Sequence, residues 1–242
     1  MAIVKSLLII FVKAFFKIYF FIFGKPKYGN LFKQTLELYN GAGFIEIFSL
    51  IRMWDAPFEE INKLVPKSGR IIDLGCGDGI LTNYLALSSK NRKLVGIEIN
   101  KNRLKDANKG VENTKFEKGD IVSGKYPKAD CIILSHVLHH LPNRKSQEKV
   151  VKETFAKLNT NGKLIIVEII ERPVLKSIFT WLTDAFIVPI LFEKKLYDFN
   201  FHYRREKEWD ELLCGNGYSI SKTYPHSKKP FSHIIYLCQI KK

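Results

Sequence analysis

Hydrophobic and polar positions alternate in a regular way from residue 71 onward. Short apolar runs bounded by glycine, asparagine or proline are separated by longer stretches with helical periodicity. The runs predicted as strands are 71–74, 94–98, 115–119, 131–135 and 163–170, and the stretches predicted as helices are 79–89, 101–109 and 146–158. Strands that alternate with helices favour a parallel sheet covered on both faces.

The flanking segments follow other patterns. Residues 31–64 are predicted to be helical, and a helix over 205–214 is followed by Gly215 and Gly217, which are typical helix stop signals. The runs GYSISKTYP and SHIIYLCQI on either side of HSKKPF predict a closing β-hairpin. With no internal repeat or low-complexity linker, one domain with insertions is the simplest organisation.

Residues 1–24 are predicted to be a hydrophobic membrane anchor. Fifteen of residues 2–23 are isoleucine, valine, leucine or phenylalanine, interrupted among charged residues only by Lys5, Lys13 and Lys17. These interruptions and the lack of a small-x-small cleavage site argue against a signal peptide. The lysines share one helical face, which favours a helix in the membrane surface, but insertion energies also allow a spanning helix. A helix buried against the domain is the third alternative.

Composition narrows the function classes. The chain has 242 residues, 46% of them hydrophobic, and carries 39 Lys and Arg against 24 Asp and Glu, a formal net charge of +15. These values exclude a disordered, fibrous or multi-span membrane protein and indicate an anionic partner, but the excess charge is spread without a nucleic-acid-binding arm. The four cysteines lie far apart with no zinc spacing, so we expect reduced thiols and no metal site.

A glycine loop carries the strongest chemical signal. In IIDLGCGDGILT, the predicted strand ends at Asp73 and Leu74, three alternating glycines follow at Gly75, Gly77 and Gly79, and a helix begins. Glycines permit a tight turn and let a ligand approach the backbone closely. The G-x-G-x-G spacing differs from the dinucleotide fingerprint, and no P-loop Lys-Ser/Thr follows, so nucleotide hydrolysis is disfavoured.

Three acids complete this pattern. Asp73 precedes the glycines and can bind an ammonium group. Glu98 ends the next strand, where a carboxylate can accept hydrogen bonds from the hydroxyls of a ribose. Asp120 follows a further strand, where it can accept a hydrogen bond from an adenine amino group. The set fits a ligand with an ammonium, a carboxylate, a ribose and an adenine but no phosphate.

These motifs resemble those of the class I S-adenosylmethionine-dependent methyltransferases. DLGCGDG resembles their first motif, IEIN their second-strand acid, KGDI their adenine-side acid, SHVLHHLP the segment after their fourth strand and NGKLIIVE the turn into their fifth. The resemblance covers about residues 55–242. It implies an α/β fold: a Rossmann-like, doubly wound, mostly parallel seven-stranded sheet with a C-terminal antiparallel hairpin strand, in addition to the N-terminal hydrophobic helix.

The resemblance also implies a division of the chain and a cofactor site. Residues 25–65 would form a helical substrate or cap region, and 66–242 the methyltransferase domain, with a substrate-cap insertion at 173–200. The residues expected to bind S-adenosylmethionine are Asp73, Gly75, Gly77, Asp78, Gly79, Glu98, Ile99, Asp120, Ile121, Ser135 and His136.

The acceptor side of the reaction is less constrained. Candidates for a general base are His202, which we favour because it follows the variable insertion, and His136, His140 and Tyr203, with His139 and Glu168 as further candidates. The apolar insertion suits a lipophilic, membrane-associated acceptor methylated on oxygen or carbon, through side chains that share this apolar character: Phe179, Trp181, Leu182, Phe186 and Ile187.

Two other functions stay open at this point. The basic charge suits an RNA methyltransferase, although no RNA-binding module is visible and we expect no nucleic acid partner. A membrane-tethered S-adenosylmethionine-binding protein without catalysis is the second alternative, and an NAD-dependent oxidoreductase is disfavoured by the glycine spacing. We expect the chain at the cytoplasmic side of a membrane, and its oligomeric state is not constrained.

Overall fold

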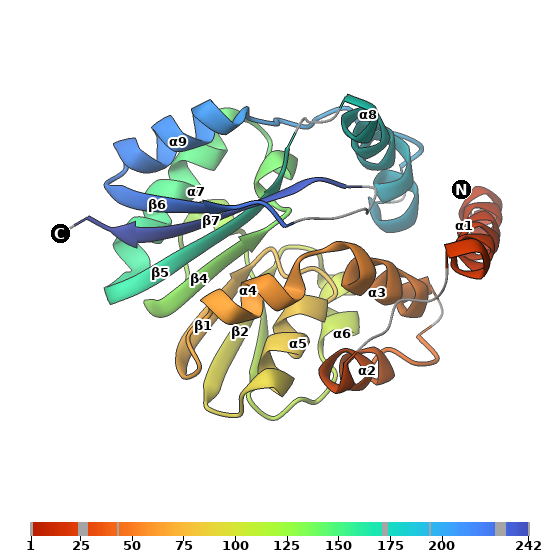
Figure 1. Cartoon of the computed structure of the whole chain (residues 1–242), viewed down its shortest axis with the longest axis horizontal. Helices are drawn as coiled ribbons and strands as arrows, with labels where there is room; N and C mark the ends of the chain where they lie inside the picture. The colour runs from red at the N-terminus through yellow and green to blue at the C-terminus, as the bar shows by residue number, and fades with distance from the viewer. Residues whose placement is uncertain are drawn as a thin grey trace.

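A seven-stranded sheet forms the centre of the molecule (Figure 1). The computed structural model describes residues 2–23, 29–42, 44–170, 174–193, 195–225 and 231–241. The strands lie in the order β3-β2-β1-β4-β5-β7-β6, and only β7 runs antiparallel to its neighbours. Their bounds are β1 Gly69–Leu74, β2 Arg92–Glu98, β3 Thr114–Lys118, β4 Ala129–Ser135, β5 Leu158–Ile169, β6 Tyr218–Thr223 and β7 His233–Ile240.

Helices cover both faces of the sheet, as Figure 1 shows. One face carries α2 Asn30–Glu37, α3 Phe44–Asp55, α4 Phe58–Leu64, α5 Ile80–Ser88 and α6 Lys101–Ala107, and the other carries α7 Arg144–Lys157 and α9 Glu206–Gly215. Successive strand residues point to opposite faces, so Ile71 and Ile133 join the first apolar core while Ile72 and Leu134 join the second. The predicted α/β fold is confirmed, including the closing hairpin.

The region predicted as one helical stretch over 31–64 consists of three helices. A turn with Gly41 at φ +73° separates α2 from α3, and Pro57 precedes α4. Proline restricts the residue before it to extended conformations, which accounts for the second break. The side chains of α3 and α4, including Met53, Phe58 and Ile61, are buried in the core.

The insertion contains an unusual helix. α8 (Val174–Leu182) continues into two π-helical turns, η3 (Thr183–Ile187) and η4 (Pro189–Glu193). The second π-helical turn begins at Pro189, which has no backbone N–H to continue the hydrogen-bond ladder. π-helical turns are frequent at functional sites, and here they place Asp184 and Ile187 on a cavity wall.

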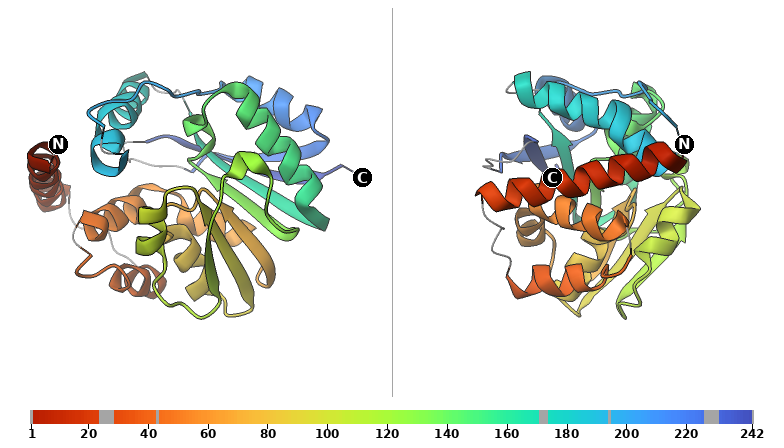
Figure 2. Two further views of the ribbon diagram at one scale, coloured as in Figure 1. Left: turned by 180° about the vertical axis from the view of Figure 1, so that it is seen from behind. Right: turned by 90° about the vertical axis from the view of Figure 1, so that its right-hand side faces the viewer.

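The N-terminal helix α1 (Ala2–Phe23) crosses one end of the molecule (Figure 2). In the right-hand view of Figure 2 it passes between α8 and α3, and the Phe16 ring meets the Trp54 ring of α3 edge-on at 5.8 Å. Among the described residues, no helix is long and apolar enough to cross a membrane. Gly24, the last residue of the predicted anchor, lies outside the described residues, as do Lys25 and Lys27.

Candidate active site

The candidate site lies at the carboxyl ends of β1 and β4, where the strand order reverses. Open α/β sheets bind their ligands in the crevice at such a switch point. A cavity of about 630 Å³ opens there. Its wall combines the loop after β1, at Asp73 and Gly75, with Arg52 of α3 and with the segment after β4, at His139.

Asp73 is a buried carboxylate at the floor of this cavity. The hydroxyl of Thr82 donates a hydrogen bond of 2.6 Å to its Oδ2. Burial raises the pKa of Asp73 from 3.8 to about 6, and the charge of Glu98 acts in the same direction, whereas Thr82 and Arg52 lower it. A cationic group bound next to this carboxylate would therefore stabilise its ionised form.

Close packing explains the glycines of the loop. Both Gly75 and Gly77 have positive φ, and a Cβ on Gly75 would lie 2.3 Å from the Val137 side chain. A Cβ on Gly77 would lie 2.4 Å from the guanidinium of Arg103, which pairs with Asp78 at 2.7 Å. Asp78 and Gly77 both line the cavity, and their role in binding the cofactor stays a prediction.

The second acid, Glu98, ends β2, and the third, Asp120, follows the end of β3, as the sequence predicted. Glu98 is buried below the loop, where its carboxylate accepts hydrogen bonds from the N–H groups of Gly77 (3.0 Å) and Asn100 (2.8 Å). Asp120 is exposed, and its Oδ1 accepts from the N–H of Val122, which caps the 3₁₀ turn η1 (Ile121–Ser123). Neither carboxylate lines the large cavity. Their cofactor roles, and those of the 62% exposed Ile99 and the buried Ile121, stay predictions.

The donor set fits S-adenosylmethionine. Asp73 can hold its ammonium group, and Arg52, whose guanidinium lines the same cavity, can hold its carboxylate. Sequence reasoning missed Arg52. The available signal was a lone basic residue within the mostly apolar stretch FSLIRMW.

His136 belongs to a buried hydrogen-bonded chain. It has a positive φ of 54°, and Arg52 donates to its Nδ1 over 3.2 Å. Its Nε2 lies 2.9 Å from Nδ1 of His233, and Nε2 of His233 lies 3.0 Å from a carboxylate oxygen of Asp55. Burial and the neighbouring Arg52 hold the pKa of His136 well below its usual range. His136 is therefore a neutral wall residue beside Ser135, as the cavity lining also shows.

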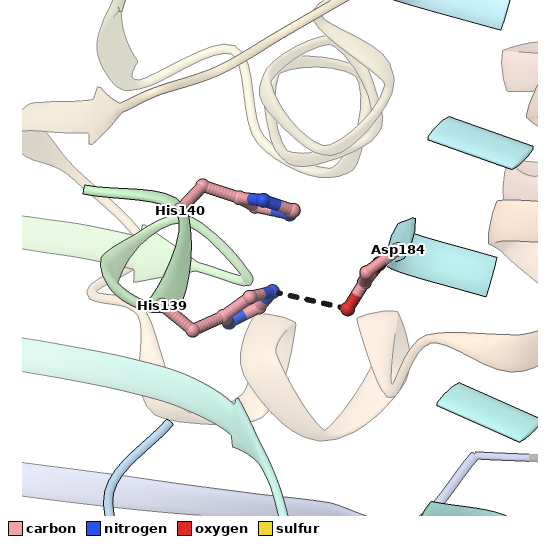
Figure 3. Close-up of side chains that lie close together, drawn as sticks. All are labelled: His139, His140 and Asp184. Carbon is pink, nitrogen blue, oxygen red and sulfur yellow. Dashed lines mark ion pairs between the residues drawn. The ribbon is translucent and has the colours of Figure 1, made fainter. Parts of the chain in front are cut away.

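A second cluster surrounds His139. Its Nδ1 donates to Glu168 over 2.6 Å, and its Nε2 lies 3.7 Å from Oδ2 of Asp184. Burial opposes the charge on His139, but Glu168 and Asp184 raise its pKa above the ordinary value. His140, which is exposed to solvent, reaches the same space (Figure 3). His139 and Asp184 can therefore bind a hydroxyl group or a cation.

The two residues after the insertion have supporting positions. His202 donates from Nε2 to the carbonyl of Pro142 over 2.8 Å, and it is not among the residues that line the cavity. Tyr203 stacks on His139 with ring centroids 5.1 Å apart and donates its hydroxyl proton to Asp184. The favoured base, His202, therefore lies away from the cavity, and the carboxylate that faces His139 is Asp184, which the sequence analysis did not single out.

Comparison with known proteins identifies the family. The Methyltransferase domain family matches residues 50–222, which include the glycine loop, the acids and the His139 segment. The chain belongs to this methyltransferase family. The predicted resemblance to the class I S-adenosylmethionine-dependent methyltransferases is thereby confirmed. S-adenosylmethionine is the cofactor that the site residues fit.

Two curated relatives of this methyltransferase are named for O-methylation. Strychnine O-methyltransferase from Strychnos nux-vomica is 28% identical over 207 residues, covering 84% of this chain and 53% of the relative. Juvenile hormone acid O-methyltransferase from Bombyx mori is 30% identical over 151 residues, covering 58% of this chain and 52% of the relative. The methyltransferase thus spans about half the length of these relatives.

A solved structure shares the fold over nearly the whole chain. Magnesium protoporphyrin IX methyltransferase from Synechocystis PCC 6803, with bound S-adenosylhomocysteine, is 16% identical with a TM-score of 0.59, and the match covers 99% of both chains. Human N-acetylserotonin methyltransferase in complex with S-adenosylmethionine is 18% identical with a TM-score of 0.58, covering 93% of this chain and 62% of that one. These likenesses establish the methyltransferase fold.

Proposed function

We propose that this protein transfers a methyl group from S-adenosylmethionine to an oxygen atom of a lipophilic small molecule. One observation carries the proposal: a single cavity joins the residues that fit the cofactor, Asp73 and Gly75, to a long apolar wall. A reaction between a polar cofactor and an apolar acceptor requires this combination, because both must reach one enclosed space.

The apolar wall comes from three elements. α1, α3 and the π-helical turns each contribute aliphatic or aromatic side chains, and together they form one continuous lining. The apolar residues contributed by these elements are Phe11, Val12, Phe15, Phe16, Phe44, Phe48, Ile51, Trp54, Ile187, Val188 and Leu191. Such a lining suits an acyl, isoprenoid or polycyclic group.

The insertion contributes differently from the sequence expectation. Ile187 lines the cavity, but Trp181, Leu182 and Phe186 are 43%, 43% and 38% exposed. The side chain of Phe179 lies outside the described residues. Trp181, Leu182 and Phe186 therefore form part of an apolar outer surface. The lining of the acceptor pocket comes mainly from α1 and α3.

The chemistry at the polar end suits an oxygen nucleophile. When bound, S-adenosylmethionine supplies a methyl group already activated by a positively charged sulfur. The protein then has to hold the acceptor in line and receive its hydroxyl proton. His139 and Asp184 stand at that end of the apolar wall, and Glu168 fixes the ring of His139 through its Nδ1. The two relatives named as O-methyltransferases support this choice of atom.

We also infer that α1 lies on the cytoplasmic surface of a membrane. Lys13 and Lys17 are exposed, as are the apolar side chains on its outer face. The exposed apolar residues of α1 that are not part of the cavity lining are Ile3, Leu7, Ile10, Ile18 and Phe21. A helix of this kind inserts its apolar side chains into the headgroup region while lysines attract anionic lipids. Because α1 also lines the cavity, an acceptor could enter from the bilayer.

The proposal is tested by following the methyl group. The purified protein is incubated with S-adenosylmethionine labelled in its methyl group and a lipid extract, and the products are partitioned between organic solvent and water. The label should enter the organic phase with the wild type and stay with the cofactor in an Asp73→Asn variant. Label transferred only to water-soluble products or to RNA would contradict a lipophilic acceptor.

A further inference from the structure

Two cavities share a wall at His140 and Asp184. The first is the large cavity described above, and the second, of about 510 Å³, opens on its other side. Polar side chains in the lining of the second cavity include Asn100, Asn102 and Asn200. These polar side chains could hydrogen-bond to a hydrated ion on its way to the shared wall.

His139, His140 and Asp184 converge at this wall. One ligand atom of each residue lies within 4.8 Å of the other two. Nε2 of His139 is 3.7 Å from Oδ2 of Asp184, and the rings of His139 and His140 have centroids 4.2 Å apart. Figure 3 shows the two rings and the carboxylate pointing toward one common space. Movements of side-chain size would bring the three atoms to metal-bonding distance.

The surroundings of the three residues resemble a prepared coordination site. The Nδ1–H of His139 is held by Glu168, which fixes the tautomer whose Nε2 has a free lone pair. A carboxylate behind a histidine is the usual outer partner of a metal-bound imidazole. Tyr203 donates to Asp184 and so orients it. Within the described part of the chain, the ring nitrogens of His140 have no hydrogen-bond partner.

We propose that His139, His140 and Asp184 bind a divalent transition-metal ion such as Zn²⁺. Two imidazoles and one carboxylate suit this class of ion, whereas Mg²⁺ and Ca²⁺ prefer oxygen ligands alone. No local motif indicates the site, because two of its ligands are adjacent histidines and the third lies in a π-helical turn 44 residues after His140.

The position of the ion would be chemically useful. Three protein ligands would leave a fourth coordination position open to an oxygen ligand. A hydroxyl oxygen bound there would have a lowered pKa, so the ion would favour loss of the acceptor's hydroxyl proton to solvent water while His139 and Asp184 act as ligands. This consequence rests on the proposed function, but ion binding itself does not.

Metal titration tests the proposal without any methyl acceptor. Co²⁺ is titrated into metal-free protein and followed by its visible absorption, and Zn²⁺ binding is measured by competition. All variants carry Cys214→Ser, because this exposed thiol could bind metal by itself. We expect one ion per chain, with binding at least tenfold weaker in His140→Ala and in Asp184→Asn, and unchanged in the control His202→Ala.

Two further readouts make the outcome decisive. Glu168→Gln should weaken binding by about 10- to 100-fold, as is usual for outer partners of metal ligands. Zn²⁺ should raise the unfolding temperature of the wild type but not of Asp184→Asn. Absence of stoichiometric binding, or equal binding by the wild type, His140→Ala and Asp184→Asn, would overturn the proposal. Because no acceptor is present, this result is independent of whether methyl transfer to a lipid is observed.

Discussion

Nε2 of His136 lies 2.9 Å from Nδ1 of His233, so the segment after β4 and the start of β7 share a buried hydrogen bond. An arginine can only donate, which makes Nδ1 of His136 an acceptor toward Arg52. His136 must then donate from Nε2 to His233, and His233 must donate from its Nε2 to Asp55. The chain of bonds therefore has one direction and fixes both tautomers.

Removing His233 should destabilise the fold. In His233→Ala, His136 and Asp55 each lose a buried partner, and such losses typically cost about 1–3 kcal/mol. Urea unfolding at pH 7.5 measures this loss. The matched control is His202→Ala, which removes one side-chain hydrogen bond to Pro142 at a half-buried site and should cost about 1 kcal/mol or less. Equal losses in the two variants would contradict the role assigned to the chain of bonds.

Asp73 should make the ligand-free protein less stable as the pH rises. Its folded-state pKa of about 6 lies above the ordinary 3.8, so the folded protein holds the proton more tightly than the unfolded chain. The resulting stabilisation is fully present below about pH 4 and is lost as the pH rises through 6. Asp73→Asn cannot ionise, so it should be more stable than the wild type at pH 7.5 by about 3 kcal/mol and similar at pH 4.

The same ionisation should control cofactor affinity in the opposite direction. The ammonium group of S-adenosylmethionine favours the ionised form of Asp73, so affinity should rise about tenfold per pH unit up to pH 6 and then level off. Calorimetric titrations between pH 5 and 8 measure this profile. Asp73→Asn should bind weakly at every pH. A wild-type affinity that stays constant from pH 5 to 7 would rule out the assigned contact.

Replacing each of two glycines that share one backbone conformation should distinguish the steric cost of an added side chain from the cost of the left-handed conformation. Gly75 and Gly110 have φ values of +74° and +72°, but only at Gly75 would a Cβ meet another side chain, that of Val137 at 2.3 Å. Gly110→Ala should cost about 1–2 kcal/mol from the left-handed conformation alone. Gly75→Ala should cost more and should also abolish cofactor binding. Similar unfolding free energies for the two variants would show that the loop tolerates a side chain.

The two faces of α1 should have separable roles. Leu7 and Phe21 on the outer face are 62% and 89% exposed, and replacing both with glutamine removes apolar area available to a membrane. Each fully inserted side chain contributes about 1.5–3 kcal/mol, so binding to anionic lipid vesicles should fall at least tenfold. Transfer to a detergent-solubilised acceptor should be unchanged. Unaltered vesicle binding would contradict the membrane-facing assignment.

The inner face of α1 should affect the acceptor. Phe16 lines the cavity and packs against Trp54. Phe16→Ala should therefore enlarge the cavity and remove apolar contacts to the acceptor, without changing the polar residues. The KM for the acceptor should rise several-fold while the affinity for S-adenosylmethionine stays the same. A loss of cofactor affinity with an unchanged acceptor KM would show that α1 acts elsewhere.

The sequence predicted those parts of the molecule that depend on local order. Strand, loop and helix follow one another at Asp73, Gly75 and Gly79, so their approximate arrangement could be derived from spacing alone. The hydrogen bond between His136 and His233 joins residues 97 positions apart, and no local sequence pattern predicts such a contact. The position of Asp184 depends on π-helical turns, which have no characteristic sequence periodicity. The choice of His202 as the general base relied on its place after the insertion, but its side chain donates a hydrogen bond to a backbone carbonyl.

Identification of the methylated product tests the central claim most directly. Wild-type protein is incubated with S-adenosylmethionine carrying a deuterated methyl group and with a lipid extract, and the products are analysed by liquid chromatography and mass spectrometry. The account predicts a strongly retained, hydrophobic product that carries the deuterated methyl group on oxygen and is missing with Asp73→Asn. A deuterated methyl group found only on a polar metabolite, on nitrogen or on RNA would contradict it.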